Sequence, residues 1–381
     1  MSTHEGTAGD SLELIAVGDV SLGDSPQVVG AGIHARFERV AEADREYPFN
    51  HAKRMLEGGD VVFGNLETPL SYRGLARWNA ASMEMRGHPD AAGRVARAGF
   101  TVLNVANNHM MQHGSDAFFD TVDALRRAHM GVAGLASTVD RRACVPLFVQ
   151  VKGVRVAILG YAFEPDKYAT GPVEYAFGPD CDIPKDVADA RTKADVVICS
   201  MHWGLEFVPY PAPEEERLGR EIIDAGAALV LGHHSHVARR VERYRNGLIA
   251  YSLGNFVFDQ VWHSSLRTGL LLRATLTRAG VTAWRTELVW IGDDFQPRPL
   301  PLDEESRKRD EFDALSQAPA WVSAPDQYAR EYERLAERNR YDSYRHFLRT
   351  LRDRPLPYTV QTLARTAQRK AAAALKRRPR A

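Results

Sequence analysis

The chain repeats one pattern that restricts its fold: a short apolar segment rich in β-forming residues ends in a cluster of polar side chains. Five segments show this pattern, namely 12–17, 60–64, 100–106, 194–200 and 227–231. Apolar residues at helical spacing occur between them, at about 50–58, 88–98, 115–129 and 213–225. Strand-like segments near 154–161 and 247–290 follow one another with little helix between them. The sequence therefore predicts an α/β fold with a mixed sheet, or with two packed sheets, and with helices outside.

Composition is typical of a soluble globular protein and excludes some functions. The formal net charge is zero over 381 residues, which argues against general nucleic-acid binding. The three cysteines, Cys144, Cys181 and Cys199, show no C-x-x-C spacing, as expected in a reducing compartment. The sequence contains neither a signal-peptide pattern nor a run of roughly 20 apolar residues. We therefore expect a cytoplasmic protein with no transmembrane segment and no nucleic-acid partner.

The polar ends of the five segments carry side chains that bind metals in other proteins. They are Asp19, Glu67, Asn108 with His109, His202, and His234 with His236. Ligands of open α/β sheets bind beyond the carboxyl ends of the strands, so we expect these side chains to converge. Oxygen and imidazole ligands without a thiolate suit Mn, Fe, Zn or Mg rather than a structural cysteine–zinc site. Each residue alone could be a cap, a turn residue or a buried histidine, but the five ends together favour a metal site.

Three histidines lie within four positions of the segment LGHHSHVARR, residues 231–240. Residues two apart in an extended segment point the same way, so we expect His234 and His236 to reach one metal cluster. His233 is then expected to point away and to contact a ligand residue or the substrate. The alternative is a polar turn that happens to be rich in imidazole.

Six motifs in a fixed order resemble the CapA family of bacterial capsule and poly-γ-glutamate synthesis proteins, which has a PGA_cap domain. They are GDVSLGD, GNLETPLS, NVANNHMMQHG, SMHWGLEF, GHHSHV and IAYSLGNFVFD. The resemblance covers roughly residues 12–290 and places the chain in the calcineurin-like metallophosphoesterase superfamily. It implies a four-layer α-β-β-α sandwich of two mixed sheets with flanking helices. We expect this domain over residues 10–300 and a helical C-terminal extension with a basic tail over 301–381.

The resemblance also implies a role for each site residue. The implied metal ligands are Asp19, Glu67, Asn108, His202, His234 and His236. Among them, Glu67 stands where the superfamily places a carboxylate that bridges two ions, with His236 at the first ion and His202 and His234 at the second. His109 matches the histidine that donates a proton to the leaving group. The further candidates for substrate contacts, or for residues that orient the ligands, are Asn65, Asn107, His233, Glu206 and Arg86.

Two positions depart from the superfamily pattern. Asp19 is followed by Val20 and Ser21, whereas related phosphoesterases carry Asp-x-His, so one ion would have fewer protein ligands and bind less tightly. Gln112 stands where the family usually has an aspartate, which changes how His109 is oriented. His113 is then either an additional site residue or a polar residue at the start of a helix.

These residues predict a metal-dependent hydrolase or transferase. One or two divalent ions would generate a metal-bound hydroxide, and His109 would act as general acid on an anionic substrate, either a phosphoester or a γ-glutamyl-type amide. The reaction would serve capsule, polymer or related biosynthesis. The alternatives are a non-catalytic metal-binding scaffold that recruits biosynthetic partner enzymes and, because the sequence has no P-loop, an amide-forming enzyme that uses a pre-activated substrate.

The region beyond about residue 300 has a different character. Its charges alternate at helical spacing, and Tyr328, Tyr332 and Leu335 form a stripe that we expect to pack on the main domain. The tail over 364–381 is basic and prone to form a helix. It could bind an anionic membrane or a polyanionic substrate, or it could be a solvated arm.

Overall fold

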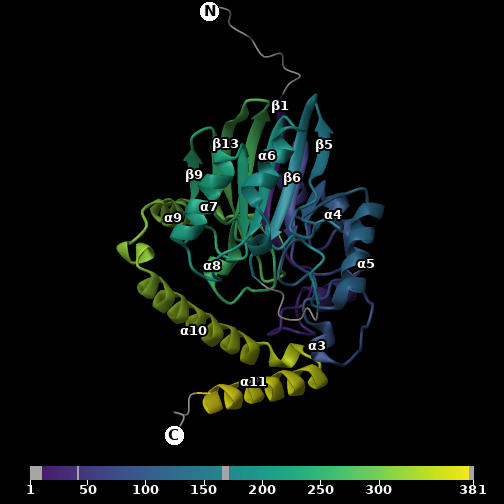
Figure 1. The fold of residues 1–381 in the computed structure, drawn as a ribbon. Helices are drawn as coiled ribbons and strands as arrows, with labels where there is room; N and C mark the ends of the chain where they lie inside the picture. The colour runs from purple at the N-terminus through teal and green to yellow at the C-terminus, as the bar shows by residue number, and fades with distance from the viewer. Residues whose placement is uncertain (1–10, 41–42, 165–170, 377–381) are drawn as a thin grey trace, which may run out of the picture.

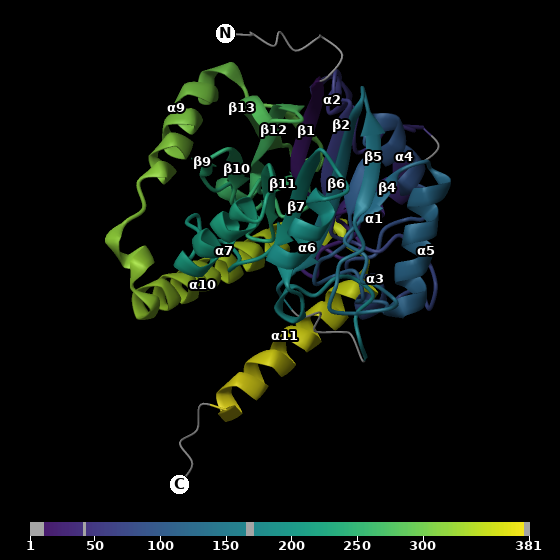
Figure 2. The ribbon, with the colours of Figure 1, turned by 45° about the horizontal axis from the view of Figure 1, so that its top comes forward.

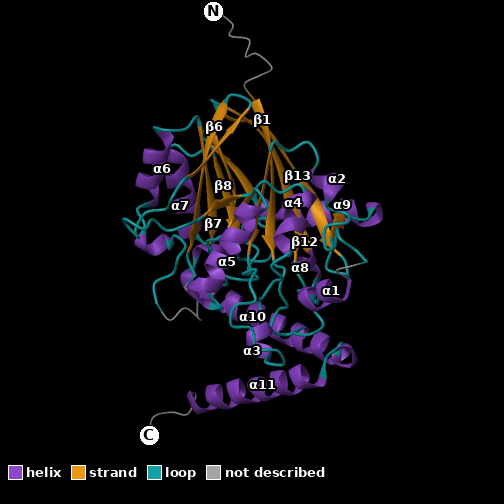
Figure 3. Ribbon diagram, turned by 90° about the vertical axis from the view of Figure 1, so that its right-hand side faces the viewer, coloured by secondary structure: helices purple, strands orange, loops and turns teal. Residues whose placement is uncertain are grey.

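The computed structural model describes residues 11–40, 43–164 and 171–376. Two mixed β-sheets pack face to face, and helices cover their outer faces (Figures 1 and 3). This arrangement confirms the predicted four-layer sandwich. A helical extension leaves the sandwich after its last strand and crosses below it in the view of Figure 1.

The first sheet has the strand order β14-β13-β12-β1-β2-β3-β4. These strands are β1 (Ser11–Val20), β2 (Val61–Leu66), β3 (Val102–Asn104), β4 (Gly131–Ala133), β12 (Thr268–Thr277), β13 (Gly280–Ile291) and β14 (Pro297–Pro299). The four strands from β1 to β4 are parallel, whereas β12, β13 and β14 join them in antiparallel pairs. A short strand, β11 (Asn255–Val257), pairs with the last residues of β1.

The second sheet has the strand order β5-β6-β7-β8-β10-β9. Its strands are β5 (Leu147–Val151), β6 (Val154–Ala162), β7 (Val196–His202), β8 (Leu229–His233), β9 (Val241–Tyr244) and β10 (Gly247–Ala250). The central strands are parallel, and the two edge strands are antiparallel. The parallel strands of both sheets therefore bring their carboxyl ends to the same side of the sandwich, which faces the helical extension (Figure 1).

Both faces of the central strands are buried, which explains their nearly continuous apolar sequences. In β1, Leu12 and Leu14 face the core between the sheets, while Ile15 and Val17 face the helices that cover the first sheet. Those helices are α1 (Ile33–Val40), α2 (Lys53–Leu56), α4 (Ala91–Ala98) and α5 (Gly114–Arg127). The outer face of the second sheet packs on α6 (Ile183–Arg191) and α7 (Pro213–Asp224).

All five apolar segments singled out in the sequence are strands, and the four expected helices are present with shorter limits. The elements that were not predicted include the helices α1 and α6 and the strand β4. The buried face of α1 consists of Ile33, His34 and Phe37. Only Ile33 and Phe37 are apolar, and two apolar residues are too few to indicate a helix. The three residues of β4 are too few for alternation to be recognised.

The C-terminal extension consists of α9 (Leu302–Asp313), α10 (Pro325–Arg349) and α11 (Leu356–Lys376). The predicted stripe on α10 is confirmed, because Tyr328, Tyr332 and Leu335 pack around Val208 in the loop that follows β7. The end of the predicted basic tail, residues 377–381, lies outside the described residues. Among the described helices, none is both long and apolar enough to cross a membrane, and the expected cytoplasmic location stays a prediction.

A close backbone contact fixes the end of β1 beside β11. The amide of Asp19 donates to the carbonyl oxygen of Gly254 at 2.8 Å, and a Cβ atom added to Gly18 would lie 1.8 Å from that oxygen. We expect Gly18→Ala to lower the free energy of unfolding by about 3 kcal/mol, because the backbone must move apart. Gly93→Ala is the control, since its Cβ would meet only the end of the Arg97 side chain at 3.4 Å and a helical alanine gains up to about 1 kcal/mol. Urea denaturation of both variants checks this, and equal stabilities would contradict it.

Candidate metal centre

The carboxyl ends of the two sheets meet at one buried cluster. The first sheet supplies Asp19 at the end of β1, Glu67 directly after β2, and Asn108 with His109 after β3. The second sheet supplies His202 as the last residue of β7, and His234 and His236 directly after β8. Every one of the six expected ligands is buried. The structure thus brings together the complete ligand set predicted from the sequence, whereas the individual roles stay predictions.

Glu67 lies at the centre of this cluster. Its Oε1 atom is 3.8 Å from Nε2 of His202 and 3.7 Å from Nε2 of His236. Two groups of side chains could each hold a metal ion: Glu67 with His202 and His234, and Glu67 with Asp19 and His236. Within each group the ligand atoms lie within 4.8 Å of one another. Glu67 belongs to both groups, so its carboxylate is placed where one residue could bridge two ions.

The chemistry of these side chains fits a cation. Neither oxygen of Glu67 has a hydrogen-bond partner among the described residues, nor does Nδ1 of His234. Burial, and then the charge of Asp19, raise the pKa of Glu67 well above its ordinary value. Burial also lowers the pKa of His202 and His234, which keeps both imidazoles in the neutral form that binds metals. A buried carboxylate without a partner is costly, and a bound cation would offset that cost.

Asp19 and His236 form the other half of the cluster. Nδ1 of His236 lies 3.5 Å from Oδ2 of Asp19 and 3.0 Å from Oδ1 of Asn255. Burial acts against the charged form of Asp19, but contacts with His233 and His236 outweigh it and hold the pKa of Asp19 well below its ordinary value. Burial likewise opposes the charge on His236, but the carboxylates of Glu67 and Asp19 raise the pKa of His236 to about 10. A cation at this position would replace the proton of His236 as the partner of both carboxylates.

Two asparagines predicted as contacts bond to candidate ligands or to a residue beside one. The Nδ2 atom of Asn65 donates to Oδ1 of Asp19 at 2.9 Å and lies 3.2 Å from Nδ1 of His202, so it links ligands from both sheets. The Nδ2 atom of Asn107 donates to the carbonyl oxygen of Leu66 at 2.7 Å, next to Glu67. Both asparagines therefore orient neighbouring residues.

His109 lies at the more open side of the cluster. Its Nε2 atom is 4.0 Å from Oε1 of Glu67, and its side chain is 19% exposed, whereas Glu67 and His202 are fully buried. Asn108 turns the other way, with Oδ1 2.8 Å from Nε2 of His202. Gln112 keeps a contact with His109, because its Oε1 atom lies 3.0 Å from Nδ1 of the imidazole. The amide thus orients His109 but cannot supply the negative charge of an aspartate.

The backbone at the three histidines differs from the expectation. The φ angles of His234 and His236 are 85° and 58°, so the segment is not extended, and the predicted alternation of side chains is wrong. Two residues in the left-handed region turn both imidazoles toward the carboxylates instead, a conformation that is uncommon outside glycine. His233 is the last residue of β8, and its Nδ1 atom lies 3.4 Å from Oδ1 of Asp19. His233 is in neither of the two groups of potential ligands found among the described residues, and its role as a contact residue stays a prediction.

Glu206 is close enough to the cluster for its charge to raise the pKa of both Glu67 and His236. It is partly exposed in the loop after β7. Burial raises the pKa of Tyr332, and Glu206 adds to this effect. Tyr332 lies on α10, so the helical extension reaches the neighbourhood of the site.

The side chains of Arg86 and His113 both contact backbone carbonyl oxygens. Arg86 is 1% exposed, and its guanidinium donates to three backbone carbonyl oxygens between Ser71 and Ser82. These backbone acceptors hold the Nε and Nη1 groups of Arg86 in the core, and its predicted substrate contact stays a prediction. His113 precedes α5, contacts the carbonyl oxygen of Glu84 at 2.8 Å, and has its pKa lowered by burial to about 4. It is the polar residue at the start of a helix that the second interpretation predicted.

Two site residues were missed in the sequence. Asn104, the last residue of β3, donates from Nδ2 to Oδ1 of Asn65 at 2.8 Å. Asn255 in β11 places its Oδ1 atom, a hydrogen-bond acceptor, 3.0 Å from Nδ1 of His236. Asn255 belongs to the motif IAYSLGNFVFD, so the motif was recognised but the asparagine within it was not assigned.

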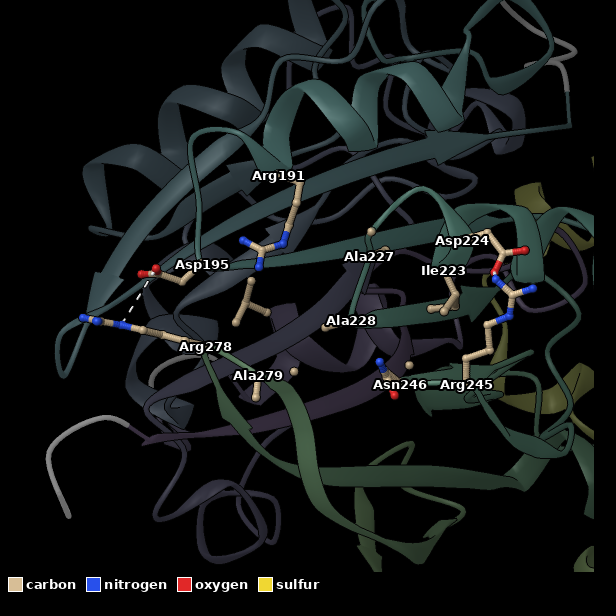
Figure 4. Close-up of a pocket in the computed structure, with 14 residues that line it drawn as sticks. Arg191, Asp195, Ile223, Asp224, Ala227, Ala228, Arg245, Asn246, Arg278 and Ala279 are labelled. Carbon is tan, nitrogen blue, oxygen red and sulfur yellow. Dashed lines mark ion pairs between the residues drawn. The ribbon is translucent and has the colours of Figure 1, made fainter. Parts of the chain in front are cut away.

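A cavity of about 310 Å³ lies at the opposite end of the sandwich (Figure 4). It is lined by residues that precede β7, β8 and β10, such as Asp195, Ala228 and Asn246. Two of its three arginines are paired with carboxylates, Arg245 with Asp224 at 2.6 Å and Arg278 with Asp195 at 3.8 Å, and Arg191 donates to the carbonyl oxygen of Ala194. None of the residues that line the cavity belongs to the carboxylate–histidine cluster.

The fold and the cluster define a class of protein: a four-layer α/β protein with a carboxylate–histidine site at the carboxyl ends of two sheets. The family model of the bacterial capsule synthesis protein PGA_cap matches residues 13–260. The chain belongs to this family, and the resemblance to CapA proteins is confirmed.

Two relatives illustrate the similarity. The chain is 34% identical to the capsule biosynthesis protein CapA of Bacillus anthracis over 263 residues, which are 66% of this chain and 61% of that protein. The match thus spans less than two thirds of the Bacillus anthracis protein. The chain is 29% identical to the PGA biosynthesis protein CapA of Bacillus subtilis (strain 168) over 307 residues, 79% of this chain and 76% of that protein.

Among solved structures, the crystal structure of 5'-nucleotidase from Candida albicans SC5314 matches with a TM-score of 0.41 and 10% identity. The match covers 87% of this chain and 58% of that chain. A likeness this distant is not evidence of any activity of this chain.

Glu67 should reduce the stability of the metal-free protein. Because its pKa is raised above the ordinary 4.5, the folded state loses stability as the pH rises from about 4.5 through the raised value. In EDTA at pH 8 we expect Glu67→Gln to raise the free energy of unfolding by about 1–3 kcal/mol, and the gain should shrink toward pH 4. Glu84→Gln is the control, because buried Glu84 is paired with Arg365 and its loss should not stabilise the fold. A lower stability of Glu67→Gln in EDTA would contradict this prediction.

Proposed function

We propose that this chain is a metal-dependent hydrolase or transferase of capsule or poly-γ-glutamate biosynthesis. The observation that carries the proposal is the shared carboxylate of Glu67, which two groups of potential ligands have in common. One or two divalent ions of Mn, Fe, Zn or Mg would be held there by the oxygen and imidazole ligands. The family and the two CapA relatives support the biosynthetic role.

The site offers a residue for each step of the proposed chemistry. A divalent ion, when bound, supplies a Lewis acid and a water of lowered pKa. His109 is placed to give a proton to the leaving group, because it borders the cluster, is partly exposed and is oriented by Gln112. Asn65 and Asn107 keep the ligands in place, so the site needs little rearrangement when substrate binds.

The substrate class follows from this chemistry and from the family. A phosphoester and a γ-glutamyl amide both present an electrophile whose oxygen a cation polarises, and both release a group that a protonated histidine assists. Both are anionic, and the negative charge of Glu206, which also acts on Glu67, would repel an anionic group that approaches from its side. We therefore propose that the substrate reaches the cluster from the side of His109, with its negative group held by the bound cations.

Metal content provides the first test of the proposal. After reconstitution with Mn or Zn, we expect His234→Ala and His236→Ala each to lower bound metal, and the double variant to retain almost none. His51→Ala is the matched control, because His51 is exposed and lies outside the cluster. Elemental analysis of the purified proteins gives the answer. Full metal retention in the double variant would refute the proposed ligands.

The role of His109 is tested by rate and metal content together. His109→Ala should keep its metal and lose activity by about 10²–10⁴-fold, the usual contribution of a general acid. Gln112→Ala should lose about 10-fold because the imidazole is no longer oriented, while Gln112→Glu retains an acceptor and should lose less. Loss of metal in His109→Ala would make it a ligand, and an unchanged rate would place the proton donor elsewhere.

A parallel screen of phosphoesters and γ-glutamyl amides with the metal-loaded protein identifies the substrate class. Turnover that disappears in His234→Ala supports an enzyme. If neither class is turned over, but the protein binds biosynthetic partner enzymes and His109→Ala binds them equally well, the chain is a metal-binding scaffold.

A further inference from the structure

The charges of the chain are strongly separated although their sum is zero. Residues 354–381 contain eight of the 49 Lys and Arg residues and none of the 49 Asp and Glu residues. The remainder of the chain is therefore acidic. Most of the basic segment is α11, which the body of the protein holds at its surface on the side of the strand carboxyl ends (Figures 1 and 2).

One face of α11 carries an exposed apolar stripe. Leu356, Val360 and Leu363 are 73%, 56% and 42% exposed, and Ala367 is exposed as well. At 100° per residue these four side chains fall within a sector of about 60°. Apolar side chains of this size at the spacing of a helix face are normally buried, so this stripe is suited to an external apolar surface.

The opposite face of α11 is anchored to the body. Tyr358 is buried and stacks on Trp78 with ring centroids 5.7 Å apart. Gln361 accepts from the amide of Ala80 at 2.9 Å and donates to the carbonyl oxygen of Trp78 at 2.6 Å. Arg365 forms an ion pair with buried Glu84. These contacts fix the rotation of the helix, and the apolar stripe consequently faces away from the protein.

We propose that α11 is a docking surface for an anionic lipid bilayer. An apolar stripe on a segment with many basic and no acidic residues is the pattern of helices that lie in the plane of the headgroups. A polyanionic polymer would use the basic residues but would leave Leu356, Val360 and Leu363 in water. A bilayer uses both features, since its headgroups would pair with the six basic residues that follow Arg365 and its hydrocarbon edge would accept the stripe.

Docking through α11 would also fix the orientation of the molecule. The helix lies on the side to which the carboxyl ends of the parallel strands point (Figures 1 and 3). The carboxylate–histidine cluster would then face the bilayer rather than the bulk solvent. This inference rests on the surface of α11 alone and does not depend on the proposed function.

Sedimentation of the full-length protein with vesicles tests the proposal. We expect binding to phosphatidylcholine vesicles that contain phosphatidylglycerol, little binding to phosphatidylcholine alone, and weaker binding as the ionic strength rises. Replacing Leu356, Val360 and Leu363 together by Asp should lower the partition coefficient by at least about 10-fold. The same three positions replaced by Ser should lower it less, because no opposing charge is introduced.

The control is Val139→Asp, an equally drastic change at an apolar residue that is 96% exposed and lies far from α11 in the sequence. It should bind vesicles like the unchanged protein. Circular dichroism establishes that each variant is folded. Three outcomes would overturn the proposal: no binding to anionic vesicles, undiminished binding by both triple variants, or binding to soluble poly-γ-glutamate without binding to vesicles. A stable dimer that the triple variants abolish would instead assign the stripe to a second copy of the chain.

Discussion

The buried carboxylate of Glu67 is the constraint on which the site depends. An ionised carboxylate without hydrogen-bond partners is unfavourable in a protein interior, and the nearby charge of Asp19 makes it more so. The protonated imidazole of His236 reduces the repulsion between the two carboxylates. Cations bound to both groups would reduce it further. The arrangement that is unfavourable for the protein alone is therefore the arrangement that would give a cation its affinity, as is common for strain stored at functional sites.

The cluster exists only when the two sheets are packed together. One sheet supplies both carboxylates and the other supplies His202, His234 and His236. Asn65 links the two sides, because its amide contacts both Asp19 and His202. Packing between the sheets is thus part of the site: a change that shifts one sheet relative to the other alters ligand distances without touching a ligand. Glycines permit the closest approach at this edge, where the backbone of β1 meets Gly254.

The sequence was sufficient for the layers and for the convergence of the candidate ligands at one edge of the sandwich, because each depends on a local pattern. An apolar segment that ends in a polar cluster marks both a buried strand and the position of its carboxyl end. The conformation of His234 and His236 was not predictable in this way, since left-handed φ angles result from the turn that follows β8 and not from alternation. The partners of Arg86 were not predictable either, because backbone carbonyl oxygens that accept from a guanidinium leave no signature in the sequence. Tertiary contacts determine both arrangements.

The net charge of zero hides an uneven distribution of charge along the chain. Taken over the whole chain it argues against a general nucleic-acid binder, but it hides an acidic remainder of the chain and a basic C-terminal segment. Near an anionic surface the body is repelled while α11 is attracted, and the resulting torque turns the molecule before any contact forms. The ends of the strands then lead, because α11 is anchored on their side through Tyr358 and Arg365. The separation of charge along the chain would therefore set the orientation of the molecule at an anionic surface, because the contacts of α11 fix the basic segment to one side of the body.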